Sequence, residues 1–268
     1  MREIEAFYDE HAQYEWERLE RHRMEFAVTM RALEDYLPPA PAKILDVGGG
    51  PGRYAIALAQ LGYYVTLFDL SQGCLTLAKQ KAKQAGVKIE GFEHGDARDL
   101  SRFANGRFDA VLLMGPLYHL LTEEDRRQAL REARRVLRSG GLIFAAFITR
   151  NAVIRWAAKE EPDWIIRHPE RLKELLSSGA LRKAPGEPGF TSAYFVHPNE
   201  IKPLMESEGF ETLDLIACEG VVSMIEEKIN ELTGDAFAAW VELNYNLRKD
   251  QSVHGAAEHL LYVGRKRT

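Results

Sequence analysis

The chain has 268 residues, of which 46% are hydrophobic and 28% are charged, a composition of folded globular domains rather than of disordered or fibrous chains. Its formal net charge of −5 weighs against a broad nucleic-acid surface. Apolar runs such as Leu142–Ile148 are far shorter than the roughly 20 residues that cross a bilayer, and residues 1–5 lack the pattern of a signal sequence. We therefore expect a cytoplasmic protein without membrane contact, built as one large domain with a lid.

Residues 1–37 predict two helices that form an N-terminal cap. Apolar residues recur at helical spacing from Ile4 to Leu37. The run Pro38–Pro41 ends the segment, because proline lacks a donor N–H and disfavours helix in the residue before it.

Strands and helices alternate over residues 43–149, the predicted core. Ser71 and Thr122 are placed to cap two of its helices. Alternation at this spacing predicts an α/β fold with a parallel sheet and right-handed crossovers. Strands are expected at residues 43–47, 63–68, 87–92, 108–114 and 142–148, and helices at residues 52–61, 71–85 and 122–137.

The alternation stops after Thr149. Residues 150–193 contain a predicted helix near 169–177 and the proline- and glycine-rich turn Pro185–Gly189. About 44 residues rarely fold alone, so this segment is predicted to be a lid inserted into the core.

Residues 194–268 are expected to return to the core sheet. A helix is predicted from His197 to Glu208, followed by a strand at Thr212–Ala217. Further helix near residues 222–248 leads to a last strand at Leu260–Gly264.

The stretch Lys43–Arg53 joins a buried-strand pattern to a glycine turn and then a helix. Glycines at positions 48, 50 and 52 follow G-x-G-x-G spacing. The dinucleotide pattern G-x-G-x-x-G needs a small residue at position 53, where Arg53 stands. The turn therefore suits a ligand without a diphosphate and weighs against a nicotinamide dehydrogenase.

At these residues the chain resembles the class I S-adenosylmethionine (SAM)-dependent methyltransferases, whose first motif is an acidic residue followed by G-x-G-x-G. The resemblance covers residues 43–148. It implies a seven-stranded, mostly parallel sheet with helices on both faces and an antiparallel last strand. It also implies SAM as cofactor and S-adenosylhomocysteine as product.

Three acids stand at the ends of predicted strands, in register with this motif. The resemblance places Asp69 at the ribose hydroxyls, Asp96 with Ala97 at the adenine, and Asp46 at the turn or the methionyl ammonium. Ligands of open parallel sheets bind at the carboxyl ends of the strands, where all three stand. The implied cofactor site is Asp46, Gly48, Gly50, Gly52, Asp69, Leu70, Asp96, Ala97 and Met114.

The segment Met114–Leu120 follows the fourth predicted strand and, in this family, lies beside the transferable methyl group. It departs from the Asn/Asp-Pro-Pro-Tyr/Phe motif of amino-methylating DNA and protein enzymes. It resembles the G-P-L-Y-H-L run of many small-molecule methyltransferases. His119 is a candidate general base, with packing under the sheet as the alternative.

Outside the core, aromatic and polar residues in the covering segments are candidates for substrate contact, with plain packing as the alternative for each. Aromatic faces suit a sulfonium through cation–π attraction. Candidate catalytic residues are His119, Tyr194 and His197, and candidate substrate contacts are Tyr8, Tyr14, Trp16, Tyr118 and Arg150.

The sequence therefore predicts a SAM-dependent methyltransferase that methylates an O, N or S atom of a small molecule, as a monomer or homodimer. An RNA or protein methyltransferase is one alternative, and a non-catalytic SAM-binding regulatory subunit is another. Cys74 and Cys218 stand alone and the histidines are scattered, so no metal site is expected.

Overall fold

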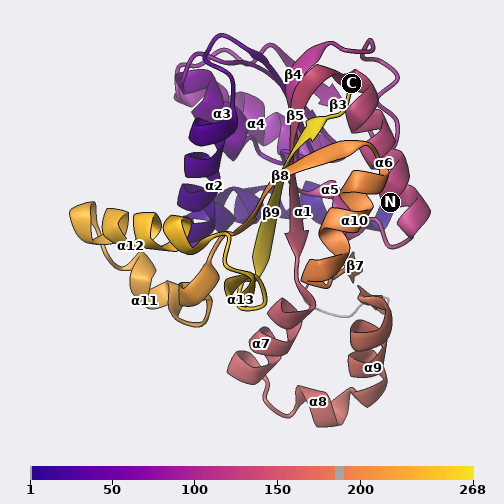
Figure 1. Cartoon of the computed structure of the whole chain (residues 1–268), viewed down its shortest axis with the longest axis vertical. Helices are drawn as coiled ribbons and strands as arrows, with labels where there is room; N and C mark the ends of the chain where they lie inside the picture. The colour runs from indigo at the N-terminus through magenta and orange to yellow at the C-terminus, as the bar shows by residue number, and fades with distance from the viewer. Residues whose placement is uncertain (1, 185–189) are drawn as a thin grey trace.

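A single twisted sheet of seven strands forms the centre of the computed structural model, which describes residues 2–184 and 190–268 (Figure 1). The five strands first in the chain are parallel, and β9 runs antiparallel to both of its neighbours. This confirms the predicted α/β fold with antiparallel closing strands. The strand order is β3 (Gly91–His94), β2 (Tyr64–Asp69), β1 (Lys43–Val47), β4 (Phe108–Leu113), β5 (Leu137–Ile148), β9 (His259–Lys266) and β8 (Phe210–Ala217).

Alternate residues of the central strands enter two separate cores, one on each face of the sheet. In β1, Leu45 joins one core and Ile44 the other. The Leu45 side is covered by α5 (Pro116–His119), α6 (Glu123–Val136), α10 (Pro198–Ser207) and α13 (Gln251–His254). The Ile44 side is covered by α2 (Arg23–Tyr36), α3 (Arg53–Gln60), α4 (Gln72–Gln84), η1 (Gly220–Ile225), α11 (Glu226–Asn230) and α12 (Gly234–Leu247).

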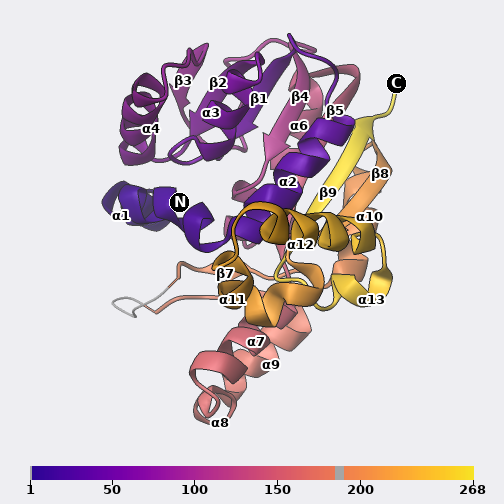
Figure 2. The same cartoon turned by 90° about the vertical axis from the view of Figure 1, so that its left-hand side faces the viewer.

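The predicted N-terminal helices are present as α1 (Arg2–Arg21) and α2, and they have different roles. The apolar face of α2 belongs to the core, where Met24, Val28 and Leu33 are fully buried. Helix α1 lies instead along the edge of the sheet, packed against α4 (Figure 2).

Residues after Thr149 form three helices that project away from the sheet (Figures 1 and 2). The returning segment brings Phe190 and Thr191 back to the sheet edge at His119. The predicted turn Pro185–Gly189 lies outside the described residues. The insertion contains α7 (Arg150–Glu160), α8 (Trp164–Arg167), α9 (Pro169–Ser178) and the two-stranded pair β6 (Ala180–Leu181) and β7 (Ala193–Tyr194).

The third strand differs most from its prediction at residues 87–92. Helix α4 ends in a turn at Gly86, whose φ is +68°, and the amide of Val87 bonds back to the carbonyl of Ala82. Residues 87–89 therefore belong to the connection that follows α4, and the pairing of β3 with β2 starts only at Gly91. The predicted helix at 222–248 is likewise divided into η1, α11 and α12.

None of the helices in the described part of the chain is both long and apolar enough to cross a membrane.

Candidate active site

The glycine turn after β1 adopts a backbone that favours glycine. Gly48, Gly50 and Gly52 have φ values of +69°, +54° and +86°, in the left-handed region. A Cβ on Gly48 would come within 2.5 Å of Pro116, so the turn and α5 approach closely. Gly52 is the N-cap residue of α3, and a Cβ on it would contact Ala78 and Leu67. Unlike Gly48 and Gly50, it does not line the cavity that lies beside this turn.

A cavity of about 960 Å³, including its open mouth, lies at the carboxyl ends of β1, β2 and β4, in the size range of small-molecule sites. Helix α1 covers it through residues such as Ile4 and Leu19. The sequence-predicted residues that line it are Tyr8, Asp46, Gly48, Gly50, Asp69, Leu70, Asp96, Ala97, Met114, Tyr118 and His119.

Asp69 holds the glycine turn and the start of α4. Its two carboxylate oxygens accept hydrogen bonds of 2.7 Å from the backbone amides of Gly50 and Ser71. Burial raises the pKa of Asp69 to about 6, against the lowering effect of these two bonds. Each oxygen keeps a free lone pair, so the carboxylate can also accept from a ligand.

Asp46 is the least satisfied acid of the cavity. It is 1% exposed, and its Oδ2 has no hydrogen-bond partner among the described residues. Burial, with the nearby charge of Asp69, raises the pKa of Asp46 to about 7. A cationic group in the cavity would satisfy this oxygen and favour the ionised acid.

Asp96 reaches the cavity but shares its carboxylate with Arg98. The Arg98 side chain donates to Asp96 Oδ2 at 2.6 Å, and the Arg98 amide donates to Oδ1 at 2.9 Å. Arg98 also bonds Asp125 of α6 at 2.7 Å. The loop after β3 is therefore fixed to α6, and a ligand at Asp96 must share it with Arg98.

His119 is buried between two other segments of the chain. Its Nε2 lies 2.8 Å from the Tyr8 hydroxyl, and its Nδ1 lies 3.1 Å from Thr191 Oγ1. Burial lowers the pKa of His119 to about 3, while a backbone hydrogen bond with Ser192 opposes the shift. Burial raises the pKa of Tyr8 well above its ordinary value, so the phenol keeps its proton and donates a hydrogen bond to Nε2. His119 is thus a neutral imidazole that donates from Nδ1 to Thr191.

Two of the predicted substrate contacts on α1 lie outside the cavity. The Tyr14 ring is 59% exposed and lies under the Arg21 guanidinium. The Trp16 ring lies 4.2 Å from Arg53 and 4.7 Å from Lys81, where it packs α1 against α3 and α4.

Three predicted residues near the insertion also lie outside the cavity, against expectation. Arg150 donates to the carbonyl of Phe195 and to Glu200. The Tyr194 hydroxyl donates to the same Glu200, and His197 caps α10. These side chains fix the insertion to α10, a role that the spacing of the residues did not reveal.

Sequence reasoning missed three residues that complete the site. Glu15 and Arg18 line the cavity from α1, and Thr191 bonds His119. Charged residues occupy so many positions of α1 that these two resembled a solvated face. Thr191 carries no motif, and only the fold brings it to His119.

Comparison with known proteins supports the methyltransferase activity that the sequence predicts. A family described as "Methyltransferase domain" matches residues 44–141. A ubiquinone biosynthesis O-methyltransferase of Thiobacillus denitrificans is 28% identical over 186 residues, which are 69% of this chain and 72% of that protein. One from Ruegeria pomeroyi is 31% identical over 157 residues, 54% of this chain and 61% of the relative, so this alignment spans less than two thirds of that protein.

Among solved structures, a SAM-dependent methyltransferase from Methanosarcina mazei has a TM-score of 0.62 at 19% identity, covering 88% of this chain and 97% of that one. At that identity the likeness concerns the fold, while the family match covers the glycine turn and the acids at the ends of the strands. This chain therefore carries a methyltransferase domain at residues 44–141, within the fold of the SAM-dependent methyltransferases.

Proposed function

We propose that the protein methylates a hydroxyl oxygen of a small aromatic molecule, with SAM as methyl donor and His119 as general base. The observation that carries the proposal is the neutral, buried imidazole of His119 in the lining of the cavity, bonded to Tyr8 and Thr191. The names of the two relatives support oxygen as the accepting atom.

The residues of the cavity fit SAM. The partnerless Oδ2 of Asp46 suits the methionyl ammonium, and the free lone pairs of Asp69 suit the ribose hydroxyls. Arg18 lines the same cavity and is the receptor that we assign to the carboxylate. SAM supplies a methyl group already activated by a positively charged sulfur, so the protein contributes chiefly position.

The aromatic side chains of Tyr8 and Tyr118 line the cavity together with His119, and Phe190 packs on His119 from outside the lining. The rings of Tyr8 and Phe190 lie 5.3 and 5.5 Å from that of His119, and Tyr118 lies at 4.8 Å. Such surfaces favour a flat, ring-bearing acceptor through offset or edge contacts.

With SAM bound, the acceptor hydroxyl would replace the Tyr8 hydroxyl at His119 Nε2. Nε2 would then take the acceptor's proton as the oxygen bonds to the methyl carbon and the electron pair of the carbon–sulfur bond passes to sulfur. One positive charge thus disappears at sulfur and one appears on the imidazole. The net charge of the cavity stays constant, which limits the cost of forming a buried imidazolium. Thr191 accepts from Nδ1 and fixes the ring orientation.

The test combines titration calorimetry with SAM and S-adenosylhomocysteine and a methyl-transfer assay on phenols, amines and thiols of similar size. We expect binding of both nucleosides and turnover of phenols. His119→Gln should keep SAM affinity and lower kcat by about 10²–10⁴-fold, whereas Tyr194→Phe, outside the cavity, should change neither. Turnover confined to amines, thiols, RNA or protein, or an unimpaired His119→Gln, would overturn the proposal.

A further inference from the structure

Arg18 reaches the cavity from α1 and is held by Glu15, which also lines the cavity, and by Glu25, which does not. Its Nη1 and Nη2 donate to the two carboxylate oxygens of Glu25 at 2.7 and 3.0 Å, and its Nε donates to Glu15 at 3.1 Å. A bidentate pair fixes the plane as well as the position of a guanidinium. The remaining N–H groups are available to a ligand in the cavity that Arg18 lines.

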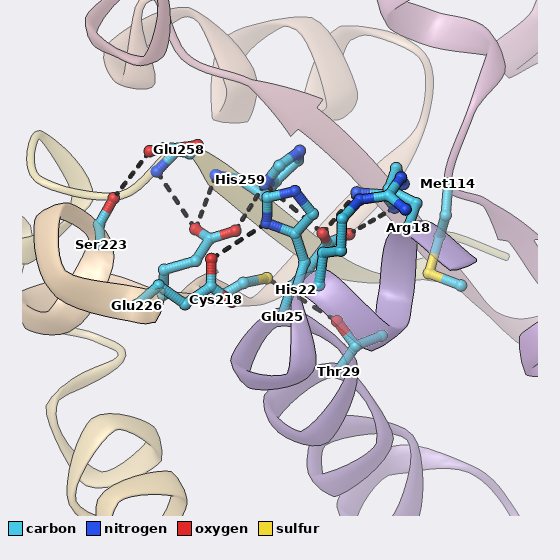
Figure 3. A network of polar contacts seen from close by, with 12 residues as sticks. Arg18, His22, Glu25, Thr29, Met114, Cys218, Ser223, Glu226, Glu258 and His259 are labelled. Atoms are coloured by element: carbon cyan, nitrogen blue, oxygen red, sulfur yellow. Dashed lines mark hydrogen bonds and ion pairs between the residues drawn. The ribbon is translucent and has the colours of Figure 1, made fainter. Parts of the chain in front are cut away.

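Glu25 is in turn held from the far end of the chain. It is 6% exposed, and its Oε2 lies 3.7 Å from Nδ1 of His259, at the start of β9. The same Nδ1 bonds Glu219 Oε1 at 2.5 Å, and Glu219 Oε2 accepts from the backbone amide of His259 at 2.9 Å. Figure 3 shows this series of contacts, from the β9 end to Arg18 and Met114 at the cavity end.

Charges alternate along this series. Burial favours neutral Glu25, but the charges of Arg18 and His259 outweigh it and lower the pKa of Glu25 to about 2. Burial likewise favours neutral His259, but Glu25 and Glu219 raise the pKa of His259 to about 9. At neutral pH negative Glu25 therefore lies between positive His259 and positive Arg18, and Arg18 lines the cavity.

Glu25, Glu219 and His259 are also, within the described residues, the one group of metal-ligand side chains whose ligand atoms lie within 4.8 Å of one another. Both oxygens of Glu25 already accept from Arg18, and both oxygens of Glu219 are bonded to His259 or to backbone amides. The protein's own donors thus satisfy these carboxylate oxygens.

We propose that Glu25 and His259 are positioning residues, which set the Arg18 guanidinium to receive the carboxylate of the cofactor. The inference rests on the proposed use of SAM. It makes the C-terminal strand β9 a determinant of affinity at a site whose recognised motifs lie in the first half of the chain.

The test is calorimetry with two ligands, S-adenosylhomocysteine and 5′-methylthioadenosine, which lacks the amino-acid end. Glu25→Gln and His259→Gln should each weaken S-adenosylhomocysteine binding by about tenfold and leave methylthioadenosine binding unchanged. Tyr36→Phe is the matched control, because it removes a 2.8 Å bond between α2 and Asp214 of β8 without touching Arg18. It should change the affinity for neither ligand.

A double variant separates positioning from a general effect on folding. If Glu25 acts through Arg18, adding Glu25→Gln to Arg18→Met should cost no further affinity. Equal losses for both ligands, unchanged binding, or tighter binding of S-adenosylhomocysteine by Glu25→Gln would overturn the inference alone. Failure of the unsubstituted protein to bind either ligand would overturn the proposed use of SAM, and the inference with it.

Discussion

The charge of the cofactor cavity depends on the ionisation of Asp46. Its pKa of about 7 in the ligand-free protein means that the acid is protonated below neutrality. An ammonium group binds the ionised form, so SAM affinity should be constant above about pH 8 and fall by up to about tenfold per pH unit below pH 7. Asp69, with a pKa of about 6, should add a second loss at lower pH.

Calorimetric titration between pH 5.5 and 8.5 measures this dependence, and buffers of different ionisation enthalpy reveal the proton released on binding. Asp46→Asn supplies the control: it should bind SAM weakly and without the loss near pH 7. An affinity that is flat through pH 7 in the unsubstituted protein would remove Asp46 from the ammonium site.

Asp69 has two tasks, because it accepts from the backbone of the glycine turn and is proposed to accept from the ribose. Asp69→Ala should therefore weaken SAM binding by about 1–3 kcal/mol, the cost of losing a charged hydrogen bond. Asp109→Ala is the control: this acid bonds the Lys43 amide and Arg138 at the other end of the strands. Equal SAM affinity in both variants would place the ribose elsewhere.

At the scale of single residues, the sequence predicts the site residues that stand at the ends of strands. Asp46 and Asp69 lie at the carboxyl ends of β1 and β2, and Asp96 follows β3. Parallel strands bring such positions to one edge of the sheet. The hydrogen-bond partners of His119 could not be predicted from the sequence, because Tyr8 lies 111 positions before it and Thr191 lies 72 positions after it. No periodicity or motif relates residues at such separations.

Among the elements, α1 is held over the cavity by a contact with the start of α4. Asp9 Oδ1 accepts from the Ser71 hydroxyl at 2.6 Å and from the Gly73 amide at 2.8 Å. The helices approach closely only because residue 73 has no side chain: a Cβ there would lie 2.8 Å from the backbone of Asp9.

Gly73→Ala should therefore displace α1. Alanine favours helix over glycine by roughly 0.5–1 kcal/mol, so α4 itself should not lose stability. We expect residues 2–14 to lose protection from hydrogen exchange, the melting temperature to change little, and SAM to bind more weakly. Gly255→Ala, whose Cβ would meet its nearest neighbour at 3.9 Å, is the matched control. Retained protection of α1 would contradict this account of its docking.

The limits of prediction for the elements have physical causes. Helix caps are local, and Ser71 and Thr122 accept from the amides that their spacing indicates. The place where a strand starts to pair depends on its neighbour, so β3 begins later than its apolar residues suggest. The direction in which α7 to α9 leave the sheet depends on contacts such as Arg150 with Glu200, which are not local.

Across the whole molecule, the two ends of the chain meet at a buried group of charges. Arg18 and Glu25 come from the N-terminal helices, and Glu219 and His259 come from the last two strands and their connection. Buried charges are stable only when paired, and here each has an opposite partner. Removing one partner should therefore affect the folding of the whole chain as well as the cavity.

The pH dependence of stability tests this pairing. The His259 pKa is about 9 in the folded protein, against about 6.5 for an exposed histidine. A raised pKa means that the stabilisation is fully present below pH 6.5 and is lost as the pH rises through 9. Glu25 and Glu219 raise this pKa against the opposing effects of burial and of the Arg18 charge, and the shift corresponds to a stabilisation on the order of 3 kcal/mol.

Urea denaturation of the ligand-free protein and of His259→Gln at pH 6 and pH 9.5 measures the effect as a difference between two proteins. Asp46 and Asp69 also titrate below pH 8, but they do so in both proteins, and their contribution cancels in the difference. The stability advantage of the unsubstituted protein should shrink by roughly 3 kcal/mol between the two pH values. An advantage that is equal at pH 6 and pH 9.5 would mean that His259 is neutral when folded and that its contacts with Glu25 and Glu219 are not ion pairs.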